Sequence, residues 1–399
     1  MQIKEISAKT IKNSRGEETI EVAVRTPLGV FVSSAPSGKS KGKNETLDYS
    51  DKITEIVNRF PHLQEKISKV KFEEFKDLEE IEKVVTKKDF GANPLYALEV
   101  CLLKAVAAER GDELWQVVNE RASRFPYPVG NCIGGGLHTA HFQGRKADFQ
   151  EFLIIPRARK FADNFYIMKG CHKMCGESLK ARSALGTQND EGAWSTSIDD
   201  NEILDVLNKA RDELTEMTGD KIEIGIDVAA STFFEDKMYH YKNTARVLTK
   251  EEQMENIIEL MDKYRVGYVE DPLEEEDFDG FAMLRKKILD RLPALIVGDD
   301  LTVSNLKRFG QALVKKSVSA IIVKPNQNGS LWEIKKLVDY AKKYEKITVM
   351  SHRSGETMDY ALADLAFGFQ TEFIKTGIMG KEREMKLKRL VDIEKNLSK

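Results

Sequence analysis

Six titratable residues in the second half of the chain stand at the ends of short apolar runs, and they are the first candidates for chemistry. They are Asp227, Glu270, Asp299, Lys324, His352 and Lys375. Three carboxylates that converge on one point repel one another strongly unless a cation lies among them. Oxygen ligands without histidine or cysteine favour a hard ion such as Mg²⁺. The alternative is that each acid caps the helix after its strand, as a single Asp often does.

The two lysines, Lys324 and Lys375, end runs of the same series and could approach each other across a shared site. A lysine that is partly desolvated beside another cation has a lowered pKa, which a general base requires. Removal of a proton next to a carboxylate gives a doubly charged enediolate, whose charge a divalent metal stabilises. The residues therefore indicate metal-assisted proton abstraction, against the usual role of a single lysine as a solvated surface residue.

The elements that must position these residues recur at a regular interval. Subtraction of residue numbers gives steps of 43, 29, 25, 28 and 23 between the six positions, which fit a strand, a crossover helix and two loops. The apolar runs are 222–229, 267–271, 294–300, 320–326, 347–353 and 371–377, and amphipathic stretches such as 250–264, 330–344 and 355–367 separate them. Such repeated units predict a parallel β/α barrel, with a doubly wound open sheet as the competing architecture.

The first part of the chain has a different pattern. Alternating strands are expected at 3–12, 19–25 and 30–35, followed by helices at 49–56, 75–85 and 94–110. Leu95, Leu98, Leu102 and Val106 give the last helix an apolar stripe. Strands followed by helices indicate a small α+β domain. Because Pro126 and Pro128 disfavour helix, residues 125–128 are the predicted linker, and the domains are predicted at 1–125 and 126–399.

Several motifs resemble those of enolases, the phosphopyruvate hydratases, across nearly the whole chain. They are Ser351–Thr357, Gly298–Val303, Lys324–Gln327, Glu270–Pro272, Gly225–Ser231, Ser14–Gly16, Gly135–His138 and Gln150–Phe152. The resemblance implies an α/β enolase-type (β/α)8-like barrel with a smaller N-terminal α+β domain. It also implies an Mg²⁺-dependent lyase that dehydrates 2-phosphoglycerate to phosphoenolpyruvate.

The resemblance assigns roles to individual positions. Asp227, Glu270 and Asp299 match the ligands of the first of two Mg²⁺ ions, and Lys324 matches the base that removes the C2 proton. Glu191 matches the acid that helps to expel the C3 hydroxyl, with Glu151 as its partner and His138 nearby. The remaining matches are substrate contacts: Lys375 for the carboxylate, Arg353 and Ser354 for the phosphate, His352 beside them, and Ser40 for the second Mg²⁺.

The chain departs from the usual enolase pattern at several loops. Asn13 replaces an acidic residue, the loop 37–42 carries Lys39 and Lys41, and the segment 138–151 is longer than usual. Ala193 stands where a glycine is usual, and Asp392 replaces an interface arginine opposite Glu21. These changes leave two other possibilities: a paralogue that acts on a different α-proton carboxylic acid, and a non-catalytic enolase-like binding protein.

Composition excludes several classes of function. The chain has 399 residues with 62 Lys and Arg against 65 Asp and Glu, so it lacks the basic field of a nucleic-acid coating protein. Its apolar runs are too short to span a membrane, and its opening residues lead directly into a strand without a secretory signal. Four irregularly spaced cysteines are typical of a reduced, cytoplasmic protein. The expected partners are a small phosphorylated acid and further copies of the chain, as a dimer or higher homo-oligomer.

Two further motifs are weak. Residues 33–40 end in Gly38-Lys39-Ser40 but lack the first glycine and the apolar helix of a P-loop. Cys171-His172-Lys-Met-Cys175 supplies only three local ligands for zinc, and cysteines at this spacing on a helix are more often packed core residues.

Overall fold

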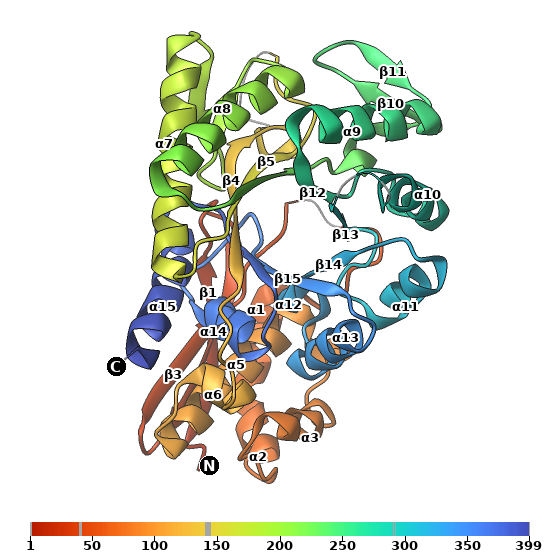
Figure 1. Cartoon of the computed structure of the whole chain (residues 1–399). Helices are drawn as coiled ribbons and strands as arrows, with labels where there is room; N and C mark the ends of the chain where they lie inside the picture. Colours follow the sequence, from red (N-terminus) through yellow and green to blue (C-terminus); the bar gives the residue numbers. More distant parts are fainter. Residues whose placement is uncertain (1, 40–41, 140–144, 290, 292, 399) are drawn as a thin grey trace.

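The N-terminal part of the computed structural model is a three-stranded antiparallel sheet covered by helices (Figure 1). The structure describes the whole chain except residues 1, 40–41, 140–144, 290, 292 and 399. The strands are β1 (Glu5–Lys12), β2 (Glu18–Thr26) and β3 (Gly29–Ser34). The helices are α1 (Ile53–Arg59), α2 (Leu63–Ile67), α3 (Leu78–Glu82), α4 (Lys87–Phe90), α5 (Ala92–Arg110) and α6 (Leu114–Asn119). The predicted stripe on α5 is buried, and α5 packs against β2 and β3.

Eight strands of the described residues close into a barrel, because the last strand pairs with the first. In spatial order they are β4 (Tyr127–Gly134), β5 (Glu151–Pro156), β8 (Ile222–Asp227), β12 (Val266–Glu270), β13 (Leu295–Gly298), β14 (Ala320–Val323), β15 (Ile347–Ser351) and β16 (Phe373–Lys375). The prediction of a β/α barrel is confirmed, and each predicted apolar run overlaps one of the last six strands, with β12 beginning one residue before its run. The first strand begins at Tyr127, inside the predicted linker.

One barrel strand differs from a fully parallel arrangement. Strand β5 runs antiparallel to both β4 and β8. The described residues that connect β4 to β5 hold only the short 3₁₀ turn η3 (Gly136–Thr139), and a parallel neighbour would need a longer crossover, usually a helix. This reversal brings the start of β5, at Glu151, to the same end of the barrel as the last residue of β8, Asp227.

Helices surround the barrel, and polar residues outside the candidate site begin several of them. The helices are α7 (Phe161–Ala181), α8 (Asp200–Thr218), α9 (Lys250–Tyr264), α10 (Phe278–Leu289), α11 (Leu306–Lys315), α12 (Pro325–Asn328), α13 (Leu331–Lys343), α14 (Ala361–Gly368) and α15 (Lys381–Leu397). Asp199, Thr249, Asn305 and Ser330 cap α8, α9, α11 and α13 by accepting hydrogen bonds from backbone N–H groups. These residues satisfy the amides that helix starts leave unpaired.

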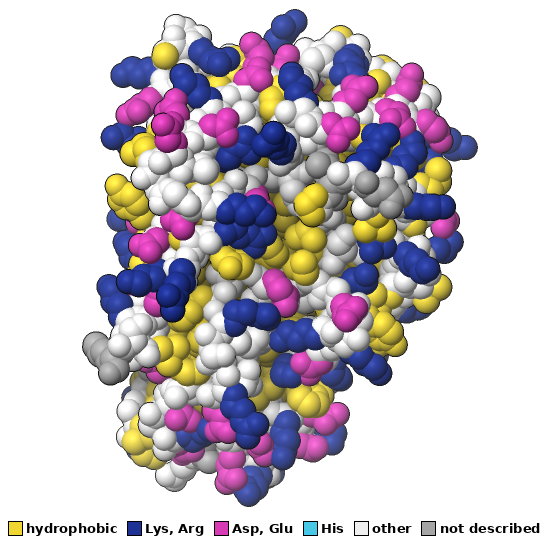
Figure 2. Space-filling view, in the orientation of Figure 1, with side chains coloured by type: hydrophobic (Ala, Val, Ile, Leu, Met, Phe, Trp, Pro, Cys, Tyr) yellow, Lys and Arg dark blue, Asp and Glu magenta, His cyan; other side chains and the backbone are white. Residues whose placement is uncertain are grey.

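The remaining elements lie outside the barrel wall. Strands β6 (Leu185–Gln188) and β7 (Trp194–Thr196) extend the sheet from β4, and β9 (Phe234–Glu235), β10 (Met238–Tyr241) and β11 (Arg246–Leu248) form a small separate sheet. The other 3₁₀ turns are η1 (Phe60–His62), η2 (Phe75–Asp77) and η4 (Ala230–Phe233). Among the described residues, no helix has the length and apolar character needed to cross a bilayer. On the face in Figure 2, basic and acidic side chains are interspersed.

Candidate active site

The predicted site residues meet in a polar cavity at the carboxyl ends of the parallel barrel strands. Its walls are Gly38, Lys39, His138, Gln150, Glu151, Glu191, Asp227, Asp299, Lys324, Ser351, His352, Arg353, Ser354 and Lys375. Glu270 is fully buried and reaches the same cluster through Lys375. Ser40 lies outside the described residues. The arrangement agrees with β/α barrels, whose strand ends and following loops converge on one site.

The Lys375 ammonium group lies among three carboxylates. Its Nζ is 3.0 Å from Asp227 Oδ2, 2.9 Å from Glu270 Oε1 and 3.1 Å from Glu151 Oε2. Burial and then the charge of Asp227 raise the pKa of Glu270 well above its usual value. The opposing lysine charge does not fully compensate this cluster, which is the electrostatic setting in which a divalent cation is favoured.

Lys324 forms an ion pair with Asp299. Burial on its own lowers the pKa of Lys324, but the charges of Asp299 and Asp300 outweigh it, and the pKa is raised. The sequence-based expectation of a lowered pKa is therefore wrong for this arrangement, because the nearest charged group is a carboxylate and not the second lysine. The same contact lowers the pKa of Asp299 despite its burial.

The three predicted metal ligands are not helix caps, since other residues begin the helices that follow. Thr249 caps α9, Asn305 caps α11, and at the start of α10 Asp277 Oδ1 accepts a hydrogen bond of 2.8 Å from the Gly280 N–H. Asp299 Oδ1 is buried and accepts no hydrogen bond from the described residues, so it has an uncompensated acceptor. Glu270 accepts a hydrogen bond of 2.7 Å from the Tyr268 hydroxyl, which fixes its carboxylate. Asp271 accepts bonds from the backbone N–H groups of Asp299 and Asp300 at 3.0 and 2.7 Å. A set of buried carboxylates with a spare acceptor fits a hard divalent cation.

A second group of side chains lies on another wall of the cavity. His138 Nδ1 is 3.5 Å from Glu151 Oε1 and 3.7 Å from Glu191 Oε2, and His352 Nε2 is 3.7 Å from the same oxygen of Glu191. Burial lowers the pKa of His138 to about 4, so its imidazole is neutral at pH 7. Burial, and to a smaller extent the charge of Glu191, raise the pKa of Glu151, while the charge of Lys375 opposes this shift.

The turn that carries Glu191 is fixed by its neighbours. Asn189 Oδ1 accepts hydrogen bonds from the N–H groups of Glu191 at 2.9 Å and Ala193 at 3.1 Å. Gly192 has a positive φ of 77°, and a Cβ there would lie 2.4 Å from the Met379 carbonyl oxygen. Ala193 is fully buried in this turn, so the chain accommodates alanine where a second glycine is usual.

Residues of the N-terminal domain complete the cavity, and sequence reasoning missed most of their contacts. Arg353 donates from Nη2 to both Glu45 carboxylate oxygens, at 3.2 and 3.0 Å. A Cβ on Gly38 would lie 1.8 Å from that same Nη2, so a larger residue would displace the guanidinium. Ser354 Oγ accepts from the Lys39 N–H at 3.0 Å and from Arg15 Nη1 at 2.6 Å. These contacts join residues more than 300 positions apart, so no local sequence pattern predicts them.

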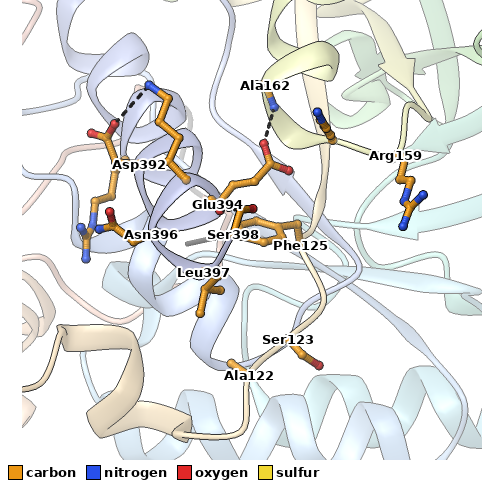
Figure 3. A pocket seen from close by; sticks show the side chains of 13 residues that line it. Ala122, Ser123, Phe125, Arg159, Ala162, Asp392, Glu394, Asn396, Leu397 and Ser398 are labelled. Atoms are coloured by element: carbon orange, nitrogen blue, oxygen red, sulfur yellow. Dashed lines mark hydrogen bonds and ion pairs between the residues drawn. The ribbon is translucent and has the colours of Figure 1, made fainter.

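A larger hollow lies elsewhere, beside the end of α15 (Figure 3). Arg159, Asp392 and Glu394 are among the residues that line it. The Glu394 carboxylate accepts hydrogen bonds from the N–H groups of Phe161 and Ala162, at 2.6 and 3.1 Å, and so caps α7. This structural role accounts for Glu394. We place the active site in the smaller polar cavity, where buried acids and bases converge.

Comparisons with known proteins agree along the full length of the chain. The family model described as "Enolase, N-terminal domain" matches residues 3–118, and "Enolase, C-terminal TIM barrel domain" matches residues 122–399. An enolase of Methanocorpusculum labreanum is 37% identical, with 99% of each chain covered. Enolases of Thermoplasma acidophilum and Archaeoglobus fulgidus are 34% and 35% identical and cover 100% of this chain and 99% and 98% of theirs. With this coverage and identity, the chain belongs to the enolase family.

Proposed function

We propose that the protein is an Mg²⁺-dependent hydro-lyase that converts 2-phospho-D-glycerate to phosphoenolpyruvate. The observation that carries the proposal is that Lys324, Asp227 and Asp299 line the same cavity as Glu191, Glu151 and His138. A proton and a hydroxyl must leave adjacent carbons in this reaction. Different acid–base residues in one cavity, with Glu151 in contact with both Lys375 and His138, suit such a division.

The metal-side residues would bind the cation and start the reaction. Asp227, Glu270 and Asp299 would hold the first Mg²⁺, consistent with the spare acceptor on Asp299. Bound there, Mg²⁺ would neutralise the carboxylates and stabilise the charge that develops on the substrate carboxylate. With the charge of Asp299 offset by the cation, the contact that raises the pKa of Lys324 would weaken. Lys324, as the neutral amine, would then take the C2 proton, and the electron pair of the broken C–H bond would remain on the substrate.

The opposite wall would complete the elimination. Glu191, supported by Glu151, would donate a proton to the C3 hydroxyl, so that the C–O bond breaks, water leaves and the C2–C3 double bond forms. The neutral His138 would form hydrogen bonds with Glu191 and Glu151 without adding a positive charge. Because the cavity is narrow and polar, its walls would exclude most bulk water from the charged intermediate.

The substrate's anionic groups would lie against the basic residues of the cavity. Lys375 would bind the carboxylate, and the planar guanidinium of Arg353 would bind the phosphate together with Ser354 and beside His352. Glu45 already orients that guanidinium through two hydrogen bonds. Ser40, next to Lys39, is the proposed contact to the second Mg²⁺.

The decisive experiment follows phosphoenolpyruvate absorbance after 2-phosphoglycerate is added to purified protein with Mg²⁺, and then with a chelator in excess. We expect turnover that the chelator stops and added Mg²⁺ restores. A panel of non-phosphorylated α-proton carboxylic acids is assayed in parallel. Turnover of only one of those acids would reject the substrate and favour the paralogue, and inactivity of folded, Mg²⁺-loaded protein on every acid would favour a binding protein.

Three further features belong to this proposal. We infer a homo-oligomer, since the edge strand β3 exposes Val30 and Val32 beside an exposed Leu28, and sedimentation analysis tests this. The chain's four cysteines are free and buried, which is typical of a cytoplasmic protein. We place the domain boundary between residues 125 and 126, and limited proteolysis tests that position.

A further inference from the structure

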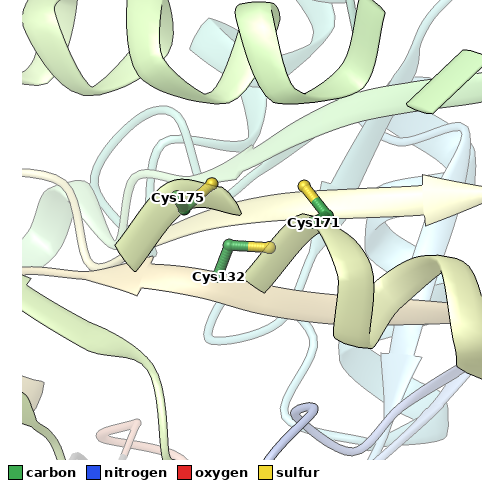
Figure 4. Close-up of side chains that lie close together, drawn as sticks. All are labelled: Cys132, Cys171 and Cys175. Atoms are coloured by element: carbon green, nitrogen blue, oxygen red, sulfur yellow. The ribbon is translucent and has the colours of Figure 1, made fainter. Parts of the chain in front are cut away.

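Three of the four cysteines meet between the barrel wall and a surrounding helix (Figure 4). Cys132 comes from β4, and Cys171 and Cys175 lie one turn apart on α7. All three side chains are fully buried, and their Sγ atoms lie within 4.8 Å of one another. In the sequence, the third candidate ligand beside Cys171 and Cys175 is His172. In the structure, the third side chain of the cluster is Cys132, and His172 has other contacts. The His172 Nε2 lies 2.8 Å from the Gly192 carbonyl oxygen, and its ring stacks on Trp194.

We propose that Cys132, Cys171 and Cys175 form a binding site for a soft, divalent d¹⁰ metal ion, of the class of Zn²⁺ and Cd²⁺. Thiolates are the ligands that such ions prefer, and both elements that supply them are regular and well packed. With metal–sulfur bonds of about 2.3 Å, three sulfurs around one ion lie about 4 Å apart. The observed spacing therefore requires closure by less than about one ångström at each pair of sulfurs.

Burial decides the charge of the complex. A net charge inside an apolar environment is costly, so the favoured complex is neutral, with two thiolates and one thiol around a divalent ion. Its formation breaks two S–H bonds and releases two protons to solvent, and no electron is transferred. The thiols already hydrogen-bond one another.

The cluster is distinct from the carboxylate cavity, because none of its three cysteines lines that cavity. An ion there would tie β4 to α7. Strand β4 leads into the turn that carries His138, and α7 holds Gly192, next to Glu191, through His172. We therefore expect the ion to stabilise the fold around the active site and to take no part in the reaction itself.

The remaining cysteine provides a matched control. Cys101 is also fully buried, but its Sγ donates to the Val22 carbonyl oxygen at 3.0 Å and lies in the N-terminal domain on α5. A Cys101→Ala variant removes a buried thiol without touching the cluster. Effects caused only by loss of a buried sulfur should therefore occur in this variant as well.

The test uses Cd²⁺ as the probe, on the full chain under argon with a phosphine reductant and saturating Mg²⁺ to occupy the carboxylates. We expect an ultraviolet thiolate-to-cadmium charge-transfer band that saturates at one Cd²⁺ per chain, and a higher melting temperature. Cys132→Ala, Cys171→Ala and Cys175→Ala should each weaken Cd²⁺ binding at least tenfold, whereas Cys101→Ala should not. Native mass spectrometry of the wild-type chain should show one added cadmium and two lost protons.

Two results would overturn the site. The first is the absence of the band and of the mass change at one equivalent of Cd²⁺ in the wild-type protein. The second is a band that survives in a folded variant of the cluster, or that disappears equally in Cys101→Ala. Since the mass measurement needs no variant, a cluster variant that fails to fold leaves the test intact.

Discussion

Replacement of Lys375 by methionine tests the view that the acid cluster needs a positive charge at its centre. The Lys375 side chain is 5% exposed, and its three carboxylate partners are no more than 4% exposed. Removal of one partner from a buried ion pair costs about 3–5 kcal/mol, because the other charge stays buried without compensation. Methionine retains most of the volume, so the loss is mainly electrostatic. We expect Lys375→Met to lower the free energy of unfolding by about 3 kcal/mol in the presence of a chelator.

Mg²⁺ should reverse much of that loss. The variant's carboxylates lack a counter-charge, so a cation that binds them stabilises the variant more than the wild-type protein. The assay is urea unfolding, followed by circular dichroism, with excess chelator and with saturating Mg²⁺. Phosphoenolpyruvate formation should be lost in both conditions, because the proposed carboxylate contact is gone.

Lys104 supplies the control for this experiment. It is a partly buried lysine, with its side chain 14% exposed, whose Nζ lies 2.8 Å from Asp359 Oδ2, and neither residue lines the active-site cavity. Lys104→Met should also destabilise the fold, but Mg²⁺ should not restore it. Equal recovery of both variants in Mg²⁺, or a Lys375→Met variant as stable as the wild type in chelator, would refute the reasoning.

Four further substitutions, in three experiments, test other parts of the structure. Gly38→Ala should raise the KM for 2-phosphoglycerate more than tenfold, because the new Cβ would collide with the Arg353 guanidinium, which Glu45 holds in place. An unchanged KM in steady-state assays would contradict this contact. Burial, and then the charge of Asp148, raise the pKa of Asp200 to about 8, so the folded state binds the extra proton between about pH 4 and 8 and stability falls as pH rises. In urea unfolding, Asp200→Asn should make the fall in the free energy of unfolding with pH less steep, by up to about 1.4 kcal/mol per pH unit. If the free energies of unfolding of the variant and the wild type change in parallel with pH, this prediction is contradicted. Lys39→Ala and Asp190→Asn each break the same partly exposed ion pair of 3.1 Å, so each should raise the KM for 2-phosphoglycerate up to about fivefold. The double variant should raise KM no more than either single variant, and additive increases would show that the ion pair is not the cause.

The repeat of apolar runs favoured a barrel over a doubly wound open sheet, because buried strands and their crossover helices leave a clear spacing in the sequence. The reversal of β5 was also accessible: the pattern before Glu151 contains no amphipathic stretch long enough for a crossover helix. The raised pKa of Lys324 was not accessible. It depends on which of several nearby charges faces the amine, and periodicity does not report the direction of a side chain.

Contacts between distant segments were the main omission. The hydrogen bonds between Glu45 and Arg353, and the approach of Cys132 to Cys171, join residues that are far apart in the sequence. No sequence pattern indicates that Glu45 or Cys132 belongs to such a pair. The fold creates such pairs, so the positions of the elements must be known first. By contrast, the acids and lysines at strand ends could be predicted as a group, since barrel topology alone brings strand ends together.

The departures from the usual enolase pattern bear on substrate choice through charge. Of the two added lysines, Lys39 is paired with Asp190, an acid of the same chain, and Lys41 lies outside the described residues. Asn13 acts locally as well: its amide donates to Glu17 and Ser37, and its Oδ1 accepts from the Arg15 N–H, which shapes the turn beside Gly355. The charges proposed to bind a carboxylate and a phosphate are those of Lys375 and Arg353, which both line the cavity. A non-phosphorylated acid would leave the Arg353 guanidinium without its intended anion, so we expect the phosphorylated substrate to be preferred in the acid panel.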